Sequence, residues 1–369
     1  MPHRTGPVGI GIIGAGVIAA QYLEQLTSFP DTEVLAIGDL RPEAAAARAE
    51  EYGVPRHGDV TTVLDDPEVE IVVNLTIPAA HHAVSSSILE AGKHVWSEKP
   101  LTTSREDAAS LLALAERTGL RVGCAPDTVL GAGIQSALRL LTSGEVGEPR
   151  SATARFRSPG PESWHPNPDF LFQRGAGPLY DMGPYYLTCL VLAFGPVSSV
   201  SAVASRASET RTIGSGPRAG ESFAVEVPTH VEGLLRFASG TVGSIELSFD
   251  DAVGRPHLLE LTGSTGTLAL PDPNVFEGAT QVAQRGAADW TEREARGAIA
   301  GRGLGVLEMA RAIRADRPHR LTGELADHVL DIMISLDEAT AGSDAVDIRS
   351  SVSAPAPLEE DFDPLASTL

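Results

Sequence analysis

Lys99, in the stretch SEKPLT (97–102), is the residue of this sequence best suited to exchanging a proton. Of the 28 basic residues only two, Lys93 and Lys99, are lysines. An ammonium group can release its proton when its surroundings lower its pKa, whereas a guanidinium keeps its charge. We therefore interpret Lys99 as a candidate general acid or base, against the alternative of a surface lysine that follows a strand. Lys93, in AGKHV, is interpreted as an ordinary charge at a helix end.

A glycine-rich turn near the start of the chain has the spacing of a dinucleotide-binding loop. In GIIGAGVIA, Gly14, Gly16 and Ala19 form the pattern G-x-G-x-x-A, after a strand pattern and before a helix pattern. Gly14 permits the tight turn, Gly16 lets the backbone approach a pyrophosphate, and Ala19 allows close packing of helix on strand. The start of the helix, at Val17 and Ile18, is then expected to contact the phosphates.

An acidic residue follows the next strand pattern, where a ribose would lie. Asp39 comes 20 residues after Ala19 and could accept hydrogen bonds from the hydroxyl groups of the adenosine ribose. A carboxylate would repel a 2′-phosphate, so Asp39 favours NAD as the cofactor. Arg41 could instead pair with such a phosphate, which keeps NADP as the alternative.

The elements that would position these residues alternate between strands and helices over the first 125 residues. Such alternation predicts a doubly wound parallel sheet, with a Rossmann dinucleotide-binding domain over residues 1–125. The predicted strands are 8–13, 33–38, 70–76, 94–97 and 120–125. The predicted helices have the sequences VIAAQYLEQLTS, RPEAAAARAEEYG, HHAVSSSILEAG and REDAASLLALAERTG.

After residue 125 the pattern changes to successive strands with few helices between them. This predicts an α+β domain over residues 126–345 with a large, mostly antiparallel open sheet, so the whole chain is of the α/β class. RFASGTVGSIELSF reads as a hairpin, and helical patterns return at 303–315 and 323–341. The last residues, 346–369, are rich in proline, alanine and acids, and we expect a flexible tail there.

Composition excludes several classes of partner. The 369 residues carry a formal net charge of −21, which disfavours nucleic acid and anionic membrane surfaces. No stretch is apolar enough over a sufficient length to span a membrane. The two cysteines, Cys124 and Cys189, are far apart and have no metal-site spacing, so we expect a reducing compartment, the cytoplasm.

The order GIIGAGVIA, DLRPEAA, LTIPAAHH, AGKHVWSEKPLT resembles the glucose–fructose oxidoreductase / inositol dehydrogenase / MocA family. GAGPLYDMGPYYLTCLVLAFGPV resembles that family's second signature, and GSTGTLALPDPN and RPHRLTGELADHVLDIM match its usual ending. The resemblance extends over residues 8–345. It implies a two-domain oxidoreductase that uses a nicotinamide cofactor on sugars, polyols or related alcohols.

The resemblance implies that Lys99 lies beside the nicotinamide and the reacting hydroxyl. Asp181 and Tyr185 correspond to the family's D-x-x-x-H pair, with tyrosine in place of histidine, so the identity of the acid/base is open. A phenol needs a cationic neighbour to ionise near neutrality, and Lys99 would provide that charge. Spacing favours Tyr185 over Tyr186 as the residue that faces the site, while Tyr186 is a candidate substrate contact.

The resemblance also suggests further cofactor contacts on the loops that follow other strands, among them His81, which matches a family position where His82 does not. The cofactor contacts expected on these grounds are Thr76, Ile77, His81, Glu98 and Lys99. An adjacent histidine pair without a third ligand is a poor metal site, so no metal is expected.

Three places are candidates for contact with substrate. Asp127 follows the last parallel strand, where ligands bind in open sheets. Trp164 and His165, in the loop SWHPNPDF, could meet the apolar face and hydroxyl groups of a sugar, although a solvated loop without a role explains them equally well. His230 lies in an alternating strand and could face either the substrate or the core of the sheet.

The function expected from these residues is an NAD(P)-dependent dehydrogenase that oxidises a secondary hydroxyl of a sugar, polyol or glycoside. One alternative is a redox-assisted glycosidase or lyase that regenerates NAD within each turnover. A second is a non-catalytic cofactor-sensing regulator, which the retention of Lys99, Asp181 and Tyr185 argues against. The resemblance further suggests a homodimer or homotetramer formed through the antiparallel sheet.

Overall fold

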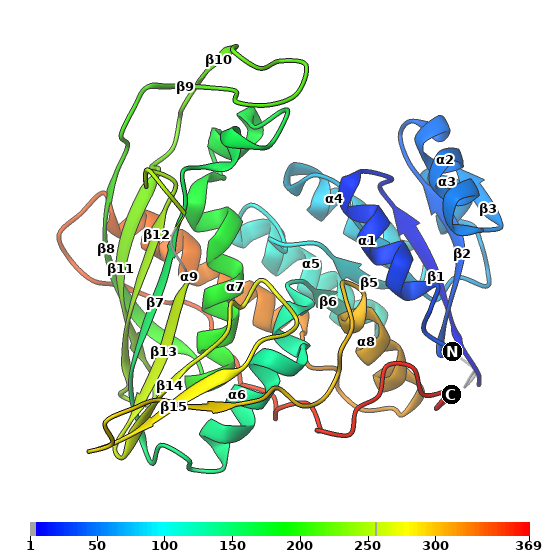
Figure 1. The fold of residues 1–369 in the computed structure, drawn as a ribbon. Coiled ribbons are helices and arrows are strands. Elements are labelled where there is room, and N and C mark those ends of the chain that lie inside the picture. The colour runs from blue at the N-terminus through cyan, green and yellow to red at the C-terminus, as the bar shows by residue number, and fades with distance from the viewer. Residues whose placement is uncertain (1–4, 255–256) are drawn as a thin grey trace. The chain divides into compact units, whose positions relative to one another are not determined.

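A computed structural model describes residues 5–254 and 257–369, which form two compact units (Figure 1). The chain passes between them four times, twice within a helix, in α6 (Ala132–Thr142) and α9 (Gly323–Ala339), and twice outside helices, after Ala295 and after Ala354. No helix in the described ranges is long and apolar enough to cross a membrane. The first unit contains the residues up to Gln135, Arg296–Leu330 and Pro355–Leu369, and the second contains Ser136–Ala295 and Asp331–Ala354.

The first unit is built on a six-stranded parallel sheet with the strand order β3-β2-β1-β4-β5-β6. Every residue of β1 and β4 is buried, as expected for strands covered on both faces. The strands are β1 (Val8–Ile13), β2 (Thr32–Gly38), β3 (Arg56–Gly58), β4 (Ile71–Asn74), β5 (His94–Ser97) and β6 (Val122–Cys124). This confirms the predicted doubly wound Rossmann sheet.

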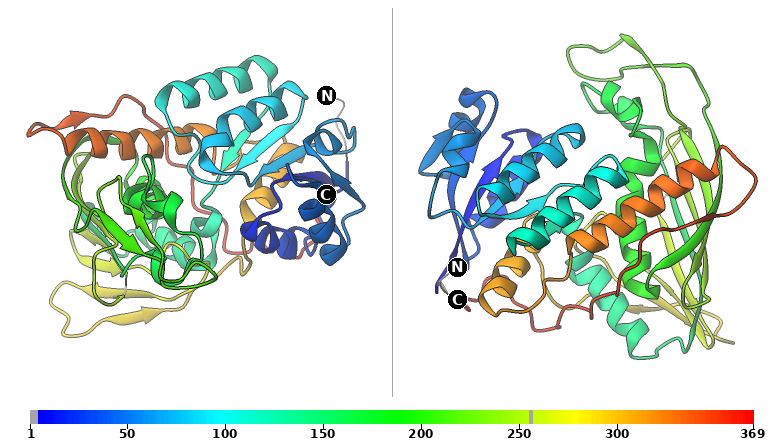
Figure 2. Two further views of the ribbon diagram at one scale, coloured as in Figure 1. Left: turned by 90° about the horizontal axis from the view of Figure 1, so that it is seen from above. Right: turned by 180° about the vertical axis from the view of Figure 1, so that it is seen from behind.

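Helices cover both faces of this sheet (Figure 2). Helix α4 packs against α5, and α1 packs against α2 and α8. Their bounds are α1 (Val17–Leu26), α2 (Pro42–Tyr52), α4 (His81–Glu90), α5 (Arg105–Thr118) and α8 (Leu304–Arg314). A further short helix, α3 (Val60–Leu64), was not predicted because it is one turn long. The side chain of Asp59 caps it by accepting from the amides of Thr61 and Thr62.

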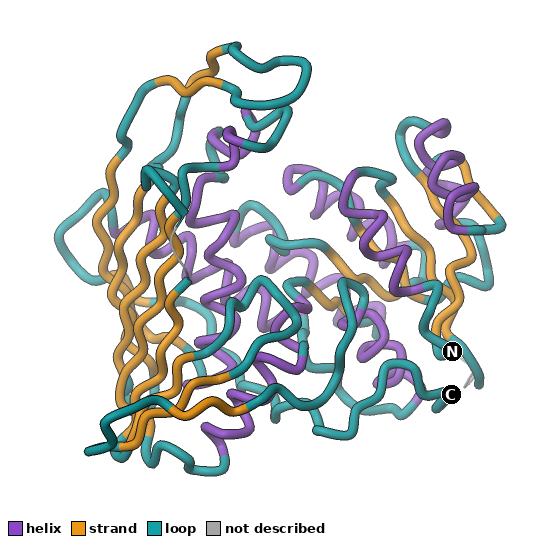
Figure 3. The backbone as a smooth tube through the Cα atoms, viewed as in Figure 1, coloured by secondary structure: helices purple, strands orange, loops and turns teal. Residues whose placement is uncertain are grey.

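The second unit is built on a nine-stranded sheet in which one pair of strands, β7 with β12, is parallel and the others are antiparallel (Figure 3). The predicted mostly antiparallel sheet is thereby confirmed, including the hairpin of β11 and β12. The sheet order is β16-β15-β14-β13-β7-β12-β11-β8-β17. The bounds are β7 (Pro149–Arg157), β8 (Val197–Ser205), β11 (His230–Phe237), β12 (Val242–Ser248), β13 (Leu258–Gly263), β14 (Gly266–Ala269), β15 (Thr280–Gln284), β16 (Thr291–Arg293) and β17 (Val346–Asp347).

One face of this sheet is covered and the other is open. Along β11, Val231 and Leu235 are buried and alternate with the exposed Glu232 and Leu234. Helix α7 (Gly177–Phe194) contacts β7, β11 and β12. The burial of β11 alternates residue by residue, as expected for a strand with one covered face. A small separate hairpin, β9 (Thr210–Thr212) with β10 (Ser222–Ala224), was not predicted.

The two compact units divide the chain differently from the predicted domains in three places. The first unit continues to Gln135, beyond the predicted limit at residue 125, and the segment Arg296–Leu330 returns to it. The third difference concerns the C-terminal segment, which was expected to be a loose tail. Residues Pro355–Leu369 instead belong to the first unit, where the amide and hydroxyl of Thr368 donate to Asp31 at 2.9 and 2.7 Å.

The contacts of the C-terminal segment explain why its composition was misleading. Arg311 of α8 donates to the carbonyl oxygens of Asp363 and Ala366 at 2.9 and 2.7 Å, and its guanidinium lies over the ring of Phe362. Leu358 is buried. A few specific anchors therefore hold a segment whose proline and acid content indicates disorder.

Candidate functional site

The glycine loop joins β1 to α1 and leaves an open approach to the helix start. Gly14 has a φ of +107°, and a Cβ there would lie 2.7 Å from the carbonyl oxygen of Leu75, so only glycine fits. A Cβ on Gly16 would meet nothing within 4 Å. Gly16 is the N-cap of α1 and offers no side-chain cap to the first amides of the helix. The loop therefore presents helix amides to open space, as a phosphate requires.

Asp39 is held at the edge of this loop. Its Oδ2 accepts a hydrogen bond from the amide of Ala15, and its Oδ1 accepts one from the amide of Arg41, both at 2.8 Å. The side chain of Arg41 is 72% exposed, with Nε 4.0 Å from the carboxylate of Asp39. The acid is therefore fixed beside the glycine loop, whereas the arginine is free to move in solvent.

A second pair of loops follows β4 and β5, which are adjacent in the sheet. After β4, the side-chain oxygen of Asn74 accepts from the amide and hydroxyl of Thr76 at 3.2 and 2.6 Å. Ile77, the next residue, is exposed. Because the carboxyl ends of parallel strands meet at one edge, the Thr76–Ile77 loop and the Lys99 loop open on the edge that carries the glycine loop.

Glu98 holds the Lys99 loop through hydrogen bonds of its carboxylate. Its Oε1 accepts a hydrogen bond from the hydroxyl of Tyr22 at 2.9 Å, and its Oε2 accepts one from the amide of Lys99 at 3.0 Å. Burial raises the pKa of Tyr22 well above its ordinary value, so this phenol stays protonated and donates. The sequence suggested that Glu98 contacts the cofactor, but both of its oxygens already bind the protein. The peptide bond between Lys99 and Pro100 is cis.

Lys93 is not the ordinary surface charge that its sequence suggested. It is buried, and its Nζ donates to the carbonyl oxygens of Asp66 and Val69 at 2.5 and 2.9 Å. The compact ammonium can serve several carbonyl groups in a narrow space, which the broader guanidinium cannot. Lys93 therefore occupies a position that a generic positive charge does not explain.

His81, an expected cofactor contact, has its ring nitrogens directed at the protein backbone, and its contact with a cofactor stays a prediction. It is fully buried at the start of α4, and its two ring nitrogens lie against two backbone carbonyl groups. Nδ1 is 2.6 Å from the oxygen of Pro100, and Nε2 is 3.1 Å from the oxygen of Thr76. Both ring nitrogens are thus occupied by the protein.

Asp127, expected to contact substrate, is buried and bonded within the first unit. Its Oδ2 accepts from the amides of Gly303 and Gly305 at 2.7 and 3.2 Å, at the start of α8. Burial raises the pKa of this carboxyl to about 6. A Cβ on Gly305 would overlap the ring of Trp96 at 2.0 Å, which explains the glycine. The partner Gly303 lies 176 residues away in the sequence, so local motifs do not predict this contact.

Helix α7 carries the signature residues of the second unit. Asp181 and Tyr185 are four residues apart and so lie on one side of the helix. Tyr185 is 5% exposed. Tyr186 is fully buried with its ring 6.4 Å from that of Phe156, and its hydroxyl has no hydrogen-bond partner among the described residues. Burial raises the pKa of Tyr186, so its phenol stays neutral. The substrate roles of the two tyrosines stay predictions.

The Trp164–His165 loop of the second unit is exposed and held in shape. Trp164 is 67% exposed, and its ring lies 5.5 Å from that of His165, which is in turn 5.5 Å from the ring of Phe170. Arg218 holds the loop through two hydrogen bonds to Asp169, at 2.8 and 3.0 Å. The three rings form an accessible aromatic surface, and contact with substrate stays a prediction.

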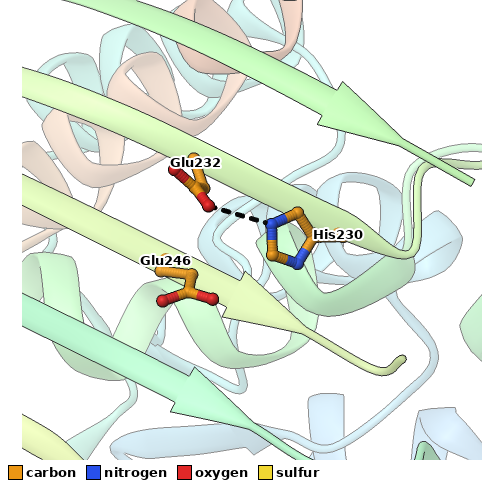
Figure 4. Close-up of side chains that lie close together, drawn as sticks. All are labelled: His230, Glu232 and Glu246. Carbon is orange, nitrogen blue, oxygen red and sulfur yellow. Dashed lines mark hydrogen bonds and ion pairs between the residues drawn. The ribbon is translucent and has the colours of Figure 1, made fainter. Parts of the chain in front are cut away.

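One group of potential metal ligands lies on the open face of the second sheet (Figure 4). Glu232 and Glu246 are directly opposite each other on β11 and β12, and His230 lies beside them. Nε2 of His230 is 3.3 Å from Oε1 of Glu232, and Glu246 forms an ion pair with Arg157. Arg157 therefore already supplies a counter-charge for Glu246. His230 is on the row of Glu232, not on the buried row of Val231.

Comparison with known protein families gives two matches along the chain. Residues 8–125 match the GFO/IDH/MocA oxidoreductase family, NAD-binding Rossmann fold. Residues 134–269 match the GFO/IDH/MocA C-terminal domain. Together the two matches cover more than half of the chain.

Individual relatives are named as sugar oxidoreductases. The chain is 29% identical over 294 residues to a dTDP-3,4-didehydro-2,6-dideoxy-alpha-D-glucose 3-reductase of Saccharopolyspora spinosa, covering 77% of this chain and 81% of the relative. It is 26% identical over 292 residues to a levoglucosan dehydrogenase of Pseudarthrobacter phenanthrenivorans, covering 71% and 73%. A solved levoglucosan dehydrogenase in complex with NADH and L-sorbose has the same fold, with a TM-score of 0.81, 21% identity, and coverage of 94% and 100%.

Proposed function

Because the chain belongs to the GFO/IDH/MocA family of oxidoreductases with an NAD-binding Rossmann fold, we propose that it is an NAD-dependent dehydrogenase of a sugar, polyol or glycoside. The observation that carries the proposal is the common placement of the glycine loop and the Lys99 loop. Both follow strands of one parallel sheet, β1 and β5, which are separated in it by β4. The names of the relatives, which act on levoglucosan and on dTDP-sugars, support a carbohydrate substrate.

The residues divide the work of oxidising a secondary alcohol. A bound NAD would supply the acceptor for the hydride of the carbinol carbon. The single hydroxyl proton would pass to Tyr185 or Lys99, which leaves the ketone as product, and Asp181 would orient the substrate or the lysine. The amide of Lys99 is held by Glu98, which fixes the base of the lysine side chain. A positioned acid/base of this kind contributes about 10²–10⁴ to the rate.

We expect a preference for NAD over NADP. The carboxylate of Asp39 is fixed by the amide of Ala15 beside the glycine loop, where it can accept from ribose hydroxyl groups and would repel a 2′-phosphate. Arg41 is exposed and could offset part of that repulsion. Replacing Asp39 by serine should therefore reduce the preference for NAD.

The test is absorbance of the reduced nicotinamide, with NAD and NADP in parallel, against free sugars, inositols and glycosides. The reverse direction is tested with NADH and keto-sugars. The wild-type protein should give turnover with one sugar class, and Lys99→Met should remove it while the protein still binds NAD. Release of sugar from a glycoside without net NADH would identify the redox-assisted lyase instead. Cofactor binding without any turnover would contradict the proposal and favour the cofactor-sensing regulator.

We also propose that the enzyme is a cytoplasmic homodimer or homotetramer. The open face of the second sheet exposes the apolar side chains of Val203, Leu234 and Val242. An apolar surface of this kind on a sheet favours association with a second copy. Light scattering of the wild type and of Leu234→Glu measures the oligomeric state, and a monomeric wild type would contradict the proposal.

A further inference from the structure

The imidazole of His81 joins two loops that follow neighbouring strands. Nδ1 lies 2.6 Å from the oxygen of Pro100, in the loop after β5, and Nε2 lies 3.1 Å from the oxygen of Thr76, in the loop after β4. The side chain is fully buried, so water does not compete for either contact. A side chain that lies between the two loops and donates a hydrogen bond to one of them restricts their relative motion.

Each of these loops carries a residue of the proposed reaction. Pro100 is bonded directly to Lys99, and Thr76 precedes the exposed Ile77, an expected cofactor contact. Asn74 holds the Thr76 side of the bridge: its side-chain oxygen accepts from Thr76, and its side-chain nitrogen donates to the carbonyl of His81 at 3.2 Å. The two loops, the histidine and the asparagine therefore form one hydrogen-bonded assembly.

We propose that His81 is a positioning residue, which fixes Lys99 relative to the dinucleotide-binding loops: its ring donates a hydrogen bond to the carbonyl oxygen of Pro100, and Asn74 ties its backbone to Thr76. The proposal rests on the role proposed above for Lys99. It is distinct from the direct cofactor contact expected from the sequence, because both ring nitrogens already face the protein.

The two contacts of the His81 ring, the Pro100 arm (Nδ1 to the Pro100 oxygen) and the Thr76 arm (Nε2 to the Thr76 oxygen), differ in strength. Both partners are carbonyl oxygens, which only accept, and a neutral imidazole has one N–H to donate. Burial is the largest effect on His81: it lowers the pKa and favours this neutral form. The two carbonyl oxygens and the charge of Glu98 raise the pKa, whereas the charge of Lys99 lowers it further. The shorter contact places the proton of the neutral ring on Nδ1, so the Pro100 arm, which is next to Lys99, is the stronger.

Amide side chains separate these two arms. In an asparagine the NH₂ group occupies roughly the place of Nδ1, and in a glutamine it occupies roughly the place of Nε2. His81→Asn therefore keeps a donor for Pro100, His81→Gln keeps a donor for Thr76, and His81→Leu keeps neither. His82→Asn is the matched control, since His82 is the next residue of α4 and lies beside Asp107 at 3.6 Å, not beside the loops.

The first measurement separates kcat from NAD affinity. His81→Leu should lower kcat about 10- to 100-fold through misplacement of Lys99, with NAD affinity changed much less. His81→Asn should retain more kcat than His81→Gln, and His82→Asn should match the wild type. Equal losses in His81→Asn and His81→Gln, or a loss of NAD affinity as large as the loss of kcat, would overturn the proposal.

A second measurement does not depend on turnover. Reductive methylation with ¹³C-formaldehyde labels the N-terminus and the only two lysines, Lys93 and Lys99, so the signal of Lys99 can be followed by NMR. That signal should move in His81→Leu and stay in place in His82→Asn. An unmoved Lys99 signal in a folded His81→Leu variant would refute the positioning role. If the wild type oxidises no sugar, the proposed function fails, yet this measurement still decides whether His81 positions Lys99.

Discussion

The carboxylate of Asp127 accepts hydrogen bonds from the amides of Gly303 and Gly305, at 2.7 and 3.2 Å, and so ties the segment after β6 to the start of α8. A helix start favours a negative charge, whereas complete burial opposes it. Burial is the larger effect here, and the pKa of Asp127 rises to about 6. This contact therefore makes a contribution to stability that depends on pH.

Replacement of Asp127 by asparagine should change the pH dependence of stability. Between pH 4 and pH 6 the folded protein binds a proton on Asp127 that the unfolded chain has released, so stability falls as pH rises through this window. A folded pKa of about 6 against an ordinary value of 3.8 corresponds to a loss of up to about 3 kcal/mol. Asparagine cannot ionise, so Asp127→Asn should gain relative to the wild type between pH 4.5 and 7.5. Urea unfolding at pH 4.5 and pH 7.5 measures the free energy of unfolding of both proteins. If the difference between Asp127→Asn and the wild type is the same at both pH values, the prediction is wrong.

The titration of His94 should make the protein less stable as pH falls, the opposite of the pH dependence of Asp127. Its Nδ1 accepts from the amide of Arg121 at 2.9 Å, and burial, helped by the charge of Arg121, lowers its pKa to about 4. Below about pH 6.5 the unfolded chain binds a proton on His94, whereas the folded protein does not bind it until about pH 4. The free energy of unfolding therefore falls by about 2–3 kcal/mol as pH drops from 6.5 to 4. Asparagine can keep the acceptor without titrating.

The experiment compares acid unfolding of the wild type, His94→Asn and His57→Asn. The first variant should lose less stability between pH 6.5 and pH 4 than the wild type. His57 is exposed and serves as the control, which should follow the wild type. If His94→Asn loses as much stability as the wild type over this range, His94 does not titrate as the structure indicates.

Substitutions of the two fingerprint glycines should separate folding from cofactor binding. A Cβ on Gly14 would clash with the backbone of Leu75 in a conformation that favours glycine, so Gly14→Ala should lower the melting temperature. A Cβ on Gly16 would meet only open space, so Gly16→Ala should fold normally. It should nevertheless bind NAD about tenfold or more weakly, because the methyl group would occupy the approach of the pyrophosphate. Thermal unfolding and NAD titration measure the two effects, and normal NAD binding by Gly16→Ala would exclude this loop as the cofactor site.

The parts of the site that the sequence could predict are those in which a short segment carries its own geometry. Gly14, Gly16 and Asp39 stand at fixed distances from strands whose buried, apolar character is visible in the sequence. The alternating pattern over residues 229–237 predicted a strand there for the same reason, and the structure has β11 in its place. Local spacing determines these features, so no distant partner is needed to recognise them.

The features that could not be predicted depend on pairs of residues far apart in the chain. Asp127 is bonded to glycines 176 and 178 positions later, and Asp31 to Thr368, 337 positions later. Either acid alone resembles an exposed, functional carboxylate. The backbone contacts of His81 and Lys93 were not predicted for a related reason, since a backbone carbonyl partner has no side-chain signature. Burial and backbone contacts, which a single sequence does not display, decide the roles of these four residues.

The two lysines of the chain allow a matched test of why lysine is kept at position 99. Lys99→Arg retains the positive charge but cannot exchange a proton near neutrality, so kcat should fall by about 10²–10⁴ while NAD affinity is nearly preserved. Lys93→Arg places a larger group where Nζ contacts Asp66 and Val69, so it should lower stability without changing the kcat of the folded protein. Steady-state kinetics over pH, together with thermal unfolding, distinguishes the two effects, and a Lys99→Arg variant with wild-type kcat would show that charge alone suffices.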